Sequence, residues 1–547
     1  MIYTYTRKIV SLHGNEIVKV KVLGCKDHQK KFIAIQDTTD LPLIPKCRAD
    51  LNVTILIGFL RWRLGFKRSE VQLFLQTKGI YMSKGAISYR SLDFLLLFKE
   101  LHRARTSKIK AFFNRKGGSI LHIDGTHRSG RRVVFVLQEG YDDMIIDSNL
   151  IPSEASEHID PFLLEFKDSY GHPLVIVRDM GKGVASSSSN VFPGIPQQVC
   201  QPHFIRDLEK DLVTQYHKGL KSSIVKHKLS SRLKKLRATE NIDNPMKGLQ
   251  QRWIHIAVDY LFYPIEKQIK WMSKPIAYHL QYNRITEVSC LVRRLVLWNA
   301  SNNCFYKPLM ELDTCLESVL GDKTVTRRYH LIKKTLEWLD VLREQLQISR
   351  DGHLKDIPSN EIDIETVKEE IKAILKNIRK EAQELGGKYE KIASEIEKAF
   401  DTHWNELFVP DPIVNGKRIS FRRHNNGLES SHRRTRKSIR ERTGRSETNR
   451  EMEQFGDLLA ILSNIWNKAY QDEILYDVPD LAYALGQYVS DLPRLRQKYR
   501  DVRKGPTIPI KDEKRLGVLD EFIHVLESIT FQDELLSTLQ SIVMTEA

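Results

Sequence analysis

The sequence predicts an α/β domain that is interrupted by a large all-α insertion and flanked by further helices. Strand-like apolar runs cluster within residues 117–210, whereas amphipathic helical spacing is almost continuous from 204 to about 410. A helical pattern then returns at Leu428. Since the chain has 547 residues, it is long enough for several domains that each bury a core of their own.

The charge of the chain indicates a polyanionic partner. Its formal net charge is +17, and the basic residues are concentrated in two places. Residues 417–450 hold twelve Lys or Arg against three acidic residues, and residues 218–237 hold eight Lys or Arg and no acidic residue. A protein this basic usually binds nucleic acid, so the composition predicts DNA as a partner.

Nothing in the sequence predicts a secreted or membrane-bound protein. The six cysteines are too few and too scattered for a disulfide framework in a chain of this size, so reduced thiols are expected. The first ten residues lack the apolar core of a signal peptide. The best apolar run, residues 52–60, is far shorter than the ~18 residues of a membrane span. We therefore expect a cytoplasmic protein with no membrane partner.

Residues 1–50 are predicted to form a small β module, with strands at 16–24 and 31–35. Cys25, His28 and Cys47 raise the alternative of a zinc site. Only Cys25 and His28 have the spacing of zinc ligands, and no fourth ligand completes the set. A β module without metal is therefore favoured.

Residues 51–110 have the pattern of a helix-turn-helix unit. An apolar helical segment is followed by a second helix, a turn at residues 79–80 and a third helix. Ser69 and Ser83 are the predicted N-caps of the two later helices. A plain helical bundle gives the same pattern, but the basic chain favours DNA recognition. The residues that the third helix would present to DNA are Lys84, Ser88, Tyr89 and Arg90.

Residues 117–210 change from helical spacing to strands. Three successive strands are followed by a helix, a fourth strand, a helical segment and a fifth strand, which is the order of an RNase H-like mixed sheet. The fourth strand is fully apolar, as expected where a sheet is covered on both faces. The strands are predicted at 118–124, 132–138, 144–151, 174–178 and 198–200, one helix at 156–170, and another from about His203.

Two carboxylates end strands of this predicted sheet, and a third lies far along the chain. Asp124 ends the first strand and Asp179 follows the fourth, and these strands are neighbours in an RNase H-like sheet. Taken alone, Asp-Gly after a strand is usually a turn and Arg-Asp usually a loop. Together with Glu429, the two aspartates form a set of hard oxygen ligands suited to two Mg²⁺ (or Mn²⁺) ions. Such a metal pair stabilises the attacking and leaving oxygens in phosphodiester chemistry.

Glu429 opens a strongly basic helical segment, and residues 416–470 are predicted as the second part of the catalytic core. Residues 211–415 form the helical insertion, and residues 471–547 are predicted as a helical C-terminal region. Ile439 is expected to pack inward. Four basic residues follow Glu429 at helical spacings of 4, 7, 8 and 11 residues, which places them on the same helix face as Glu429. This face is predicted to contact phosphate groups, and its basic residues are Arg433, Arg436, Lys437 and Arg440.

The most specific local motif is CQPHFIRDL, which follows the fifth strand and contains Cys200, His203 and Arg206. It resembles the Cys-x-x-His signature of DDE transposases of the Mutator-like superfamily and of related bacterial and archaeal insertion-sequence transposases. The segment NNGLES around Glu429 is similar to the Asn-x-hydrophobic-Glu-Ser pattern of that family. The resemblance covers residues 117–210 and 420–467 and is weak elsewhere.

The resemblance implies an RNase H-like core in which Asp124, Asp179 and Glu429 bind two metal ions. It also implies an enzyme that cuts DNA at the ends of a mobile element and transfers the freed strand. Such an enzyme would act as at least a homodimer in a prokaryotic cytoplasm, associated with the nucleoid when active. The role of Cys200 and His203 stays open: His203 contacts DNA or orients a loop, or the pair packs a strand onto a helix. One Cys and one His make half a zinc site, so no structural metal is assigned.

Other classes of enzyme lack the residues they need. Gly181-Lys182-Gly183 is outside the frame of a phosphate-binding loop, which excludes a P-loop ATPase. The Asp-Gly-Thr at residues 124–126 has no second matching loop, as an aspartic protease requires. Two rivals stay open, namely an RNase H-like nuclease without strand transfer and a domesticated DNA-binding protein without catalysis.

Overall fold

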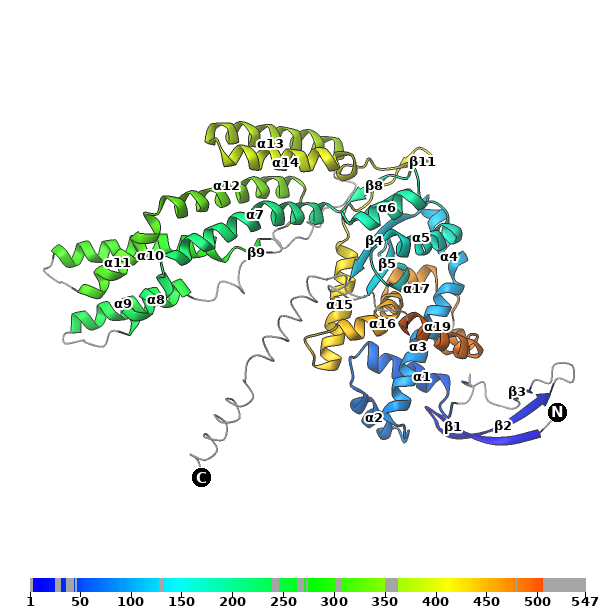
Figure 1. Cartoon of the computed structure of the whole chain (residues 1–547). Coiled ribbons are helices and arrows are strands. Elements are labelled where there is room, and N and C mark those ends of the chain that lie inside the picture. The colour runs from blue at the N-terminus through cyan, green and yellow to red at the C-terminus, as the bar shows by residue number, and fades with distance from the viewer. Residues whose placement is uncertain are drawn as a thin grey trace, which may run out of the picture.

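The computed structural model is a mixed α/β protein, largely helical and built around one central sheet (Figure 1). Three parts are visible: a small N-terminal sheet, a body around the central sheet (residues 47–199 and 409–504) and an arm of long helices (residues 200–408). The described residues are 3–24, 31–35, 44, 47–126, 132–238, 245–262, 270–271, 274–301, 306–349, 363–478 and 480–504.

The central sheet has five strands in the order β6-β5-β4-β7-β8. β4 pairs antiparallel with β5, and β5 with β6, whereas β4, β7 and β8 run parallel to one another. The five predicted strands are confirmed to within two residues at each end, and so is the predicted contact between the first and the fourth. Their bounds are β4 Ile120–Thr126, β5 Val133–Glu139, β6 Ile145–Ile151, β7 Val175–Arg178 and β8 Gln197–Val199.

Helices cover both faces of this sheet. Phe135 of β5 contacts Phe162 of α5, with ring centroids 6.0 Å apart. Because successive strand side chains point to opposite faces, Val134 faces the other way, where it lies against Gly456 of α16. The helices on the first face are α5 (Ser156–Tyr170, as predicted) and α6 (Lys182–Val191), and those on the second are α15 (Asn426–Thr443) and α16 (Asn449–Leu462).

Four helices precede the sheet, and their apolar residues belong to the same core. Ser83 is confirmed as an N-cap, because its Oγ accepts a backbone N–H at 3.1 Å. The prediction of Ser69 as an N-cap is wrong. That helix begins at Arg68, because Glu70 accepts the N–H of Lys67 at 2.7 Å and fixes the first turn there. The four helices are α1 (Leu51–Trp62), α2 (Arg68–Thr77), α3 (Lys84–Ala104) and α4 (Thr106–Lys116).

The N-terminal sheet has three antiparallel strands in the order β1-β2-β3, in agreement with the predicted β module. Cys25 and His28, on which the zinc alternative depended, lie outside the described residues. Cys47 is buried with a free thiol. The strands are β1 (Tyr3–Ser11), β2 (Gly14–Gly24) and β3 (Lys31–Ile35).

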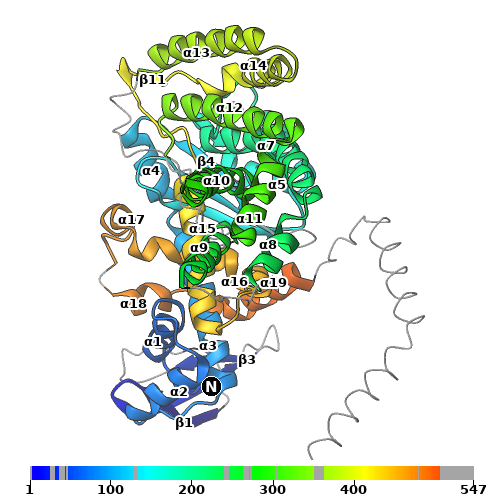
Figure 2. The same ribbon diagram turned by 90° about the vertical axis from the view of Figure 1, so that its left-hand side faces the viewer.

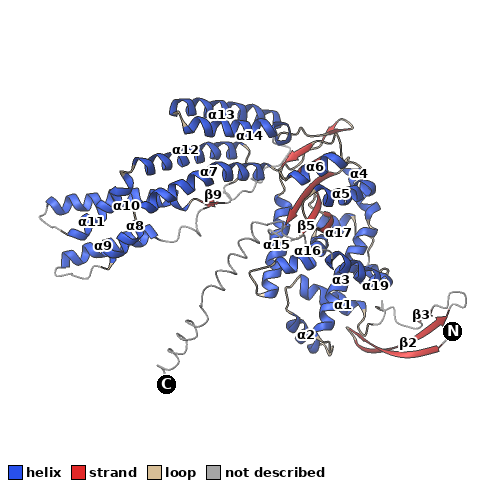
Figure 3. Cartoon of the chain, viewed as in Figure 1, coloured by secondary structure: helices blue, strands red, loops and turns tan. Residues whose placement is uncertain are grey.

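The arm has a hydrophobic core of its own, separate from that of the body. In the turned view, α13 and α14 lie along α12 and α7 (Figure 2). Figure 3 shows that the described arm is almost entirely helical, with only the short hairpin of β9 (Lys270–Trp271) and β10 (Lys274–Pro275). The helices are α7 (Gln201–Lys226), α8 (Leu229–Arg237), α9 (Pro245–Phe262), α10 (Ala277–Ser301), α11 (Lys307–Leu320), α12 (Lys323–Gln345), α13 (Ile364–Leu385) and α14 (Lys388–Leu407).

The chain returns from the arm to the body through a short hairpin and ends in further helices. The predicted helical C-terminal region is present up to residue 504, and residues 505–547 lie outside the described part. No helix in the described ranges is long and apolar enough to cross a membrane. These elements are β11 (Ile413–Val414), β12 (Lys417–Arg418), η2 (Ser463–Trp466), α17 (Lys468–Glu473), α18 (Leu481–Gly486), η3 (Val489–Asp491) and α19 (Leu492–Lys504).

Candidate active site at the edge of the central sheet

Asp124 and Asp179 lie side by side at the carboxyl ends of two neighbouring parallel strands. In the register of β4 and β7, His122 lies opposite Val177, an offset of 55 residues. Asp124 and Asp179 are separated by the same offset, so the register continued by two residues places them opposite each other. Neighbouring strands are ~5 Å apart. The two aspartates predicted from the sequence are therefore brought together by the sheet itself.

Asn425 fixes the start of α15 against this edge. Its Nδ2 donates to the carbonyl of Ile123 at 2.8 Å, and its Oδ1 accepts from Nδ1 of His122 at 3.0 Å. Its backbone N–H donates to Sγ of Cys200 at 3.3 Å. Asn425 is only 1% exposed, so water cannot replace these bonds. One residue therefore ties α15 to β4 and to the junction of β8 and α7.

Asp124 is a buried carboxylate in a crowded acidic environment. It is 8% exposed. Burial, together with the charges of Asp179, Glu429 and Glu154, raises the pKa of Asp124 to about 8, although His203 acts in the opposite direction. All three carboxylates must lie close to Asp124 for their charges to act on it. A divalent cation would relieve this repulsion and the cost of burying the charge.

Glu429 lies in the first turn of α15, where two cationic groups hold its carboxylate. Its Oε1 is 3.1 Å from Nε2 of His203 and 3.3 Å from Nη1 of Arg206. Burial raises the pKa of Glu429, but His203 and Arg206 outweigh burial and lower it to about 2. Burial lowers the pKa of His203, but Cys200 and Glu429 raise it by more. The Cys200, His203 and Arg206 signature is thus brought to Glu429, a contact that the sequence did not predict.

The side chains at this edge are of the type that binds a divalent cation, but they are not arranged around one. The described residues contain no group of three or more His, Cys, Asp or Glu side chains that could hold a metal ion as they stand. The carboxylate of Glu429 is engaged by His203 and Arg206. Asp124 and Asp179 nevertheless supply neighbouring hard oxygen ligands, and a rotamer change would free Glu429 to join them.

His432 lies against Asp124, one turn along α15 from Glu429. Its Nε2 is 3.7 Å from Oδ2 of Asp124. His432 is 9% exposed, and its Nε2 has no hydrogen-bond partner among the described residues. Burial and the charge of Arg436 lower the pKa of His432 to about 4, so the ring is neutral at pH 7. His432 was not predicted as a site residue, although its spacing of three from Glu429 puts both on one side of the helix.

Glu154 is a second site residue that was not predicted. It lies in the loop between β6 and α5, where no strand end or motif marks it. Its carboxylate covers Gly125, and its backbone carbonyl lies against Gly183, so a Cβ at either glycine would collide with it. The two glycines therefore allow this loop to approach the strand of Asp124 and the helix that follows Asp179.

The basic side chains of α15 fall into two groups. Arg433, Lys437 and Arg440 are exposed and accessible to a polyanion. Arg436 departs from the predicted shared face, because its Nη2 donates to Oγ1 of Thr126 at 2.8 Å, at the end of β4. Ile439 packs inward as predicted, with 1% exposure.

The polar residues that the sequence predicts for DNA contact on α3 differ in their surroundings. Lys84 and Tyr89 are exposed. Oγ of Ser88 accepts a weak bond from Arg68 at 3.4 Å. Arg90 is paired within the protein, since its Nη1 is 3.1 Å from the buried carboxylate of Asp93. Lys84 and Tyr89 are therefore the members of this set that are most accessible.

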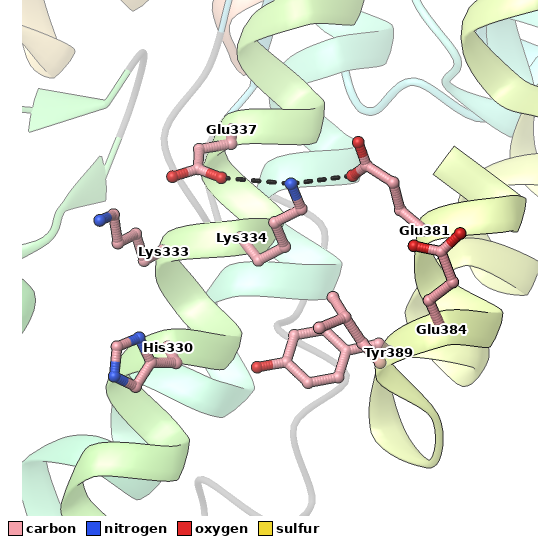
Figure 4. A pocket seen from close by; sticks show the side chains of 8 residues that line it. His330, Lys333, Lys334, Glu337, Glu381, Glu384 and Tyr389 are labelled. Atoms are coloured by element: carbon pink, nitrogen blue, oxygen red, sulfur yellow. Dashed lines mark ion pairs between the residues drawn. The ribbon is translucent and has the colours of Figure 1, made fainter. Parts of the chain in front are cut away.

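A groove of about 540 Å³ lies away from this edge, between α12 and the pair α13 and α14 (Figure 4). Lys334 lies among its acidic residues, with Nζ 3.5 Å from Glu337 and 2.8 Å from Glu381. Glu381 also accepts from Nε1 of Trp338 at 2.8 Å. These contacts join the helices of the arm, so we do not assign the active site to this groove.

A scan of the chain against protein-family models found no match, and a search among curated proteins found no significant match either.

Proposed function

We propose that this protein is a DDE-type transposase that cuts DNA at the ends of a mobile element and joins the freed strand to target DNA. The observation that carries the proposal is the juxtaposition of Asp124 on β4 and Asp179 just after β7, the parallel strand beside it. The strand order, with three antiparallel strands and then two parallel to β4, is that expected of an RNase H-like core. Glu429 is near enough to Asp124 for its charge to act there, and it completes the acidic set.

Each side chain of the site has a distinct task in this proposal. Two Mg²⁺ (or Mn²⁺) ions, when bound, supply the charge that activates a water or a 3′-hydroxyl and stabilises the leaving oxygen. Asp124 and Asp179 would hold them, the former fixed by the sheet and the latter also by the Gly181 N–H at 2.9 Å. Glu429 would be the third ligand, and His203, by lowering the pKa of Glu429, keeps its carboxylate ionised.

The basic surfaces supply the binding of DNA in this proposal. Exposed arginines on α15 lie on the helix that carries Glu429, where their planar guanidinium groups suit phosphate oxygens. Helices α1 to α3 would act as a helix-turn-helix unit that reads the ends of the element. Because two ends must be joined in one reaction, we expect a homo-oligomer of at least two chains, in the cytoplasm of a prokaryote. The exposed residues assigned to DNA are Arg433, Lys437 and Arg440 on α15, and Lys84 on α3. Arg436 and Arg90, which were also predicted to contact DNA, are instead paired within the protein.

The proposal is tested with the full chain, Mg²⁺ or Mn²⁺, and two DNA substrates. One is an intact duplex that carries the sequences flanking the reading frame, and the other is a pre-cleaved duplex offered together with a plasmid. We expect cleavage of the first and joining of the second. Asp124→Asn is expected to reduce both cleavage and joining at least about a thousandfold, because the metal ligands act together and the loss of one disables the whole set. Asp142→Asn is the matched control, on a hairpin where Asp142 pairs with Lys116 at 3.3 Å, and it should change neither reaction.

The outcomes separate the proposal from its rivals. Cleavage without joining would identify an RNase H-like nuclease that lacks strand transfer. Binding of the flanking DNA with neither cleavage nor joining, in either metal, would identify a DNA-binding protein without catalysis. Undiminished cleavage by Asp124→Asn would show that the two aspartates are not the catalytic pair.

A further inference from the structure

We propose that Nε2 of His432 is a metal ligand in the candidate active site, so that one ion is bound by nitrogen as well as oxygen and Mn²⁺ is preferred over Mg²⁺. The inference rests on the proposed function and deepens it, because it assigns a further ligand and a class of ion to the same site. The observation behind it is the contact between His432 and Asp124.

The distance between the two donor atoms is that of ligands sharing an ion. Nε2 of His432 and Oδ2 of Asp124 are 3.7 Å apart. This is longer than an N–H···O hydrogen bond, which is ~2.9 Å. Two donors that each lie ~2.1 Å from one ion are about 3.0 Å apart at a 90° angle and about 3.6 Å apart at 120°. The two atoms are therefore too far apart for a hydrogen bond and lie close to the wider of these ligand spacings, so a small movement would let them bind one ion.

Both groups are buried, and Nε2 of His432 has no partner among the described residues that would account for its position. His432 is 9% exposed, and no described residue forms a hydrogen bond with its Nε2. Asp124 is also buried, with 8% exposure. Burying a polar group without a partner is costly. An ion shared with Asp124 would give Nε2 of His432 the partner that it lacks.

The fold fixes His432 more directly than it fixes Glu429. The bond from Asn425 to the carbonyl of Ile123, at 2.8 Å, holds the start of α15 next to the strand of Asp124. His432 faces that strand as it stands, whereas Glu429 is engaged by the cations of α7. Asp124 and His432 therefore need the least rearrangement to bind an ion, and Glu429 joins when its ion pairs open.

A nitrogen ligand changes which ion the site prefers. Mg²⁺ takes oxygen ligands and usually keeps several waters. Imidazole suits transition metals, and Mn²⁺ also accepts carboxylate oxygen, so Mn²⁺ matches a mixed set of ligands better. A site of carboxylates alone would serve both ions. With His432 as a ligand, the full chain should bind Mn²⁺ more tightly than Mg²⁺.

The test compares His432→Gln with His330→Gln in the full chain. Gln keeps a polar side chain but replaces the ring nitrogen, and His330 is an exposed histidine on α12 in the arm. Mn²⁺ affinity is measured by titration calorimetry, and pulsed electron paramagnetic resonance detects nitrogen bound directly to Mn²⁺. We expect a nitrogen coupling in the wild type and in His330→Gln. His432→Gln should lose this coupling and bind Mn²⁺ at least about tenfold more weakly, since even outer-shell partners have effects of that size.

The ligand assignment would be overturned if the wild type bound no Mn²⁺ or showed no nitrogen coupling. It would also be overturned if the coupling persisted unchanged in His432→Gln. A further variant, His203→Gln, tests the other histidine of the site, and loss of the coupling in that variant alone would assign the nitrogen ligand to His203. Strand cleavage separates this inference from the proposed function. If the wild type and His432→Gln cut and join DNA with the same metal preference, the transposase proposal stands and the ligand assignment falls. If Mn²⁺ binds through His432 but no DNA is cut in any metal, the transposase proposal falls alone.

Discussion

The body and the arm place their residues by different physical means. In the body, the hydrogen-bonded register of β4 and β7 determines that Asp124 lies beside Asp179. In the arm, amphipathic helices pack around a separate core, and their relative positions depend on side-chain contacts, both apolar and polar. Strand register therefore determines the positions of the two aspartates, whereas the position of Glu429 depends on how the chain returns after the arm.

The two ends of the arm are fastened together where they meet the sheet. Nε2 of Gln198 and Nε2 of Gln201 both donate to the carbonyl of Leu407, at 2.9 and 3.1 Å. Arg178 at the end of β7 pairs with Glu406 of α14 at 2.7 Å. The entry and exit of the arm are thus joined at β8. The start of the arm also contacts the site directly, because His203 and Arg206 of α7 pair with Glu429.

The largest expected effect is on the unfolding free energies of the two cores, which we expect to be independent. Leu137 of β5 and Leu339 of α12 are both 0% exposed and belong to different clusters. Truncation of either leucine to Ala should cost about 2–5 kcal/mol of unfolding free energy. We expect two transitions in denaturant, with Leu137→Ala lowering that of the body and Leu339→Ala that of the arm, as followed by hydrogen exchange. A single transition that both variants shift equally would show that body and arm unfold as one unit.

The next effect tests how Glu429 and His432 are held against the sheet. Asn425→Ala removes the hydrogen bonds that the buried carbonyl of Ile123 and Nδ1 of His122 make with Asn425, so it should cost the body about 2–4 kcal/mol. Strand cleavage should fall with it. Asn426→Ala is the matched control, because the Asn426 Oδ1 is buried without a partner, and its loss should cost little. Equal destabilisation by both variants would show that the hydrogen bonds of Asn425 do not determine how α15 is held against β4.

The parts of the site that follow from strand register could be predicted from the sequence. Short apolar runs with an acidic residue at the end mark β4 and β7, and the order of the elements determines which strands are neighbours. Glu429 could be identified from its motif, but its contacts with His203 and Arg206 depend on a helix more than two hundred residues earlier. No local pattern carries such a tertiary contact.

The residues that were missed share a physical reason. Glu154 lies in a loop, and only the close approach of that loop to Gly125 brings it to the site. His432 has a helical spacing from Glu429, but its contact with Asp124 depends on the rotation of α15 about its axis. Arg436 was placed on the outer face for the same reason, whereas it reaches Thr126. Spacing predicts which residues share a helix face, but tertiary packing decides which way that face points.

A pH dependence is expected in the arm from His279. This residue is 8% exposed and stacks on Tyr329, with ring centroids 4.8 Å apart. Burial, followed by the charges of His217 and Lys333, lowers the pKa of His279 to about 4. In the unfolded chain, the imidazole of His279 takes up a proton at pH ~6.5, whereas in the folded arm it stays neutral to a lower pH. The stability that this difference contributes is therefore complete above pH ~6.5 and is lost as the pH falls toward the folded pKa.

The expected loss for the arm between pH 7 and pH 5 is about 2 kcal/mol. Denaturant unfolding of the wild type and of His279→Gln at both pH values isolates this contribution, since all other groups are shared. The variant should have a flatter pH profile for the arm transition and an unchanged profile for the body. The same slope in both proteins would mean that His279 is protonated within the folded arm.

The smallest expected effect is on DNA affinity, and it tests which part of the molecule would contact the phosphates of DNA. Arg440 on α15 and Lys376 on α13 are both exposed, so each single charge is equally accessible to a polyanion. If α15 carries the phosphate contacts, Arg440→Gln should weaken binding by about 1 kcal/mol on any sequence and reduce the slope of log K against log salt by about one. Lys376→Gln should do neither, as measured by fluorescence anisotropy over a series of salt concentrations. An equal change in both variants would mean that total charge, and not the position of α15 beside the acidic edge, determines where DNA lies.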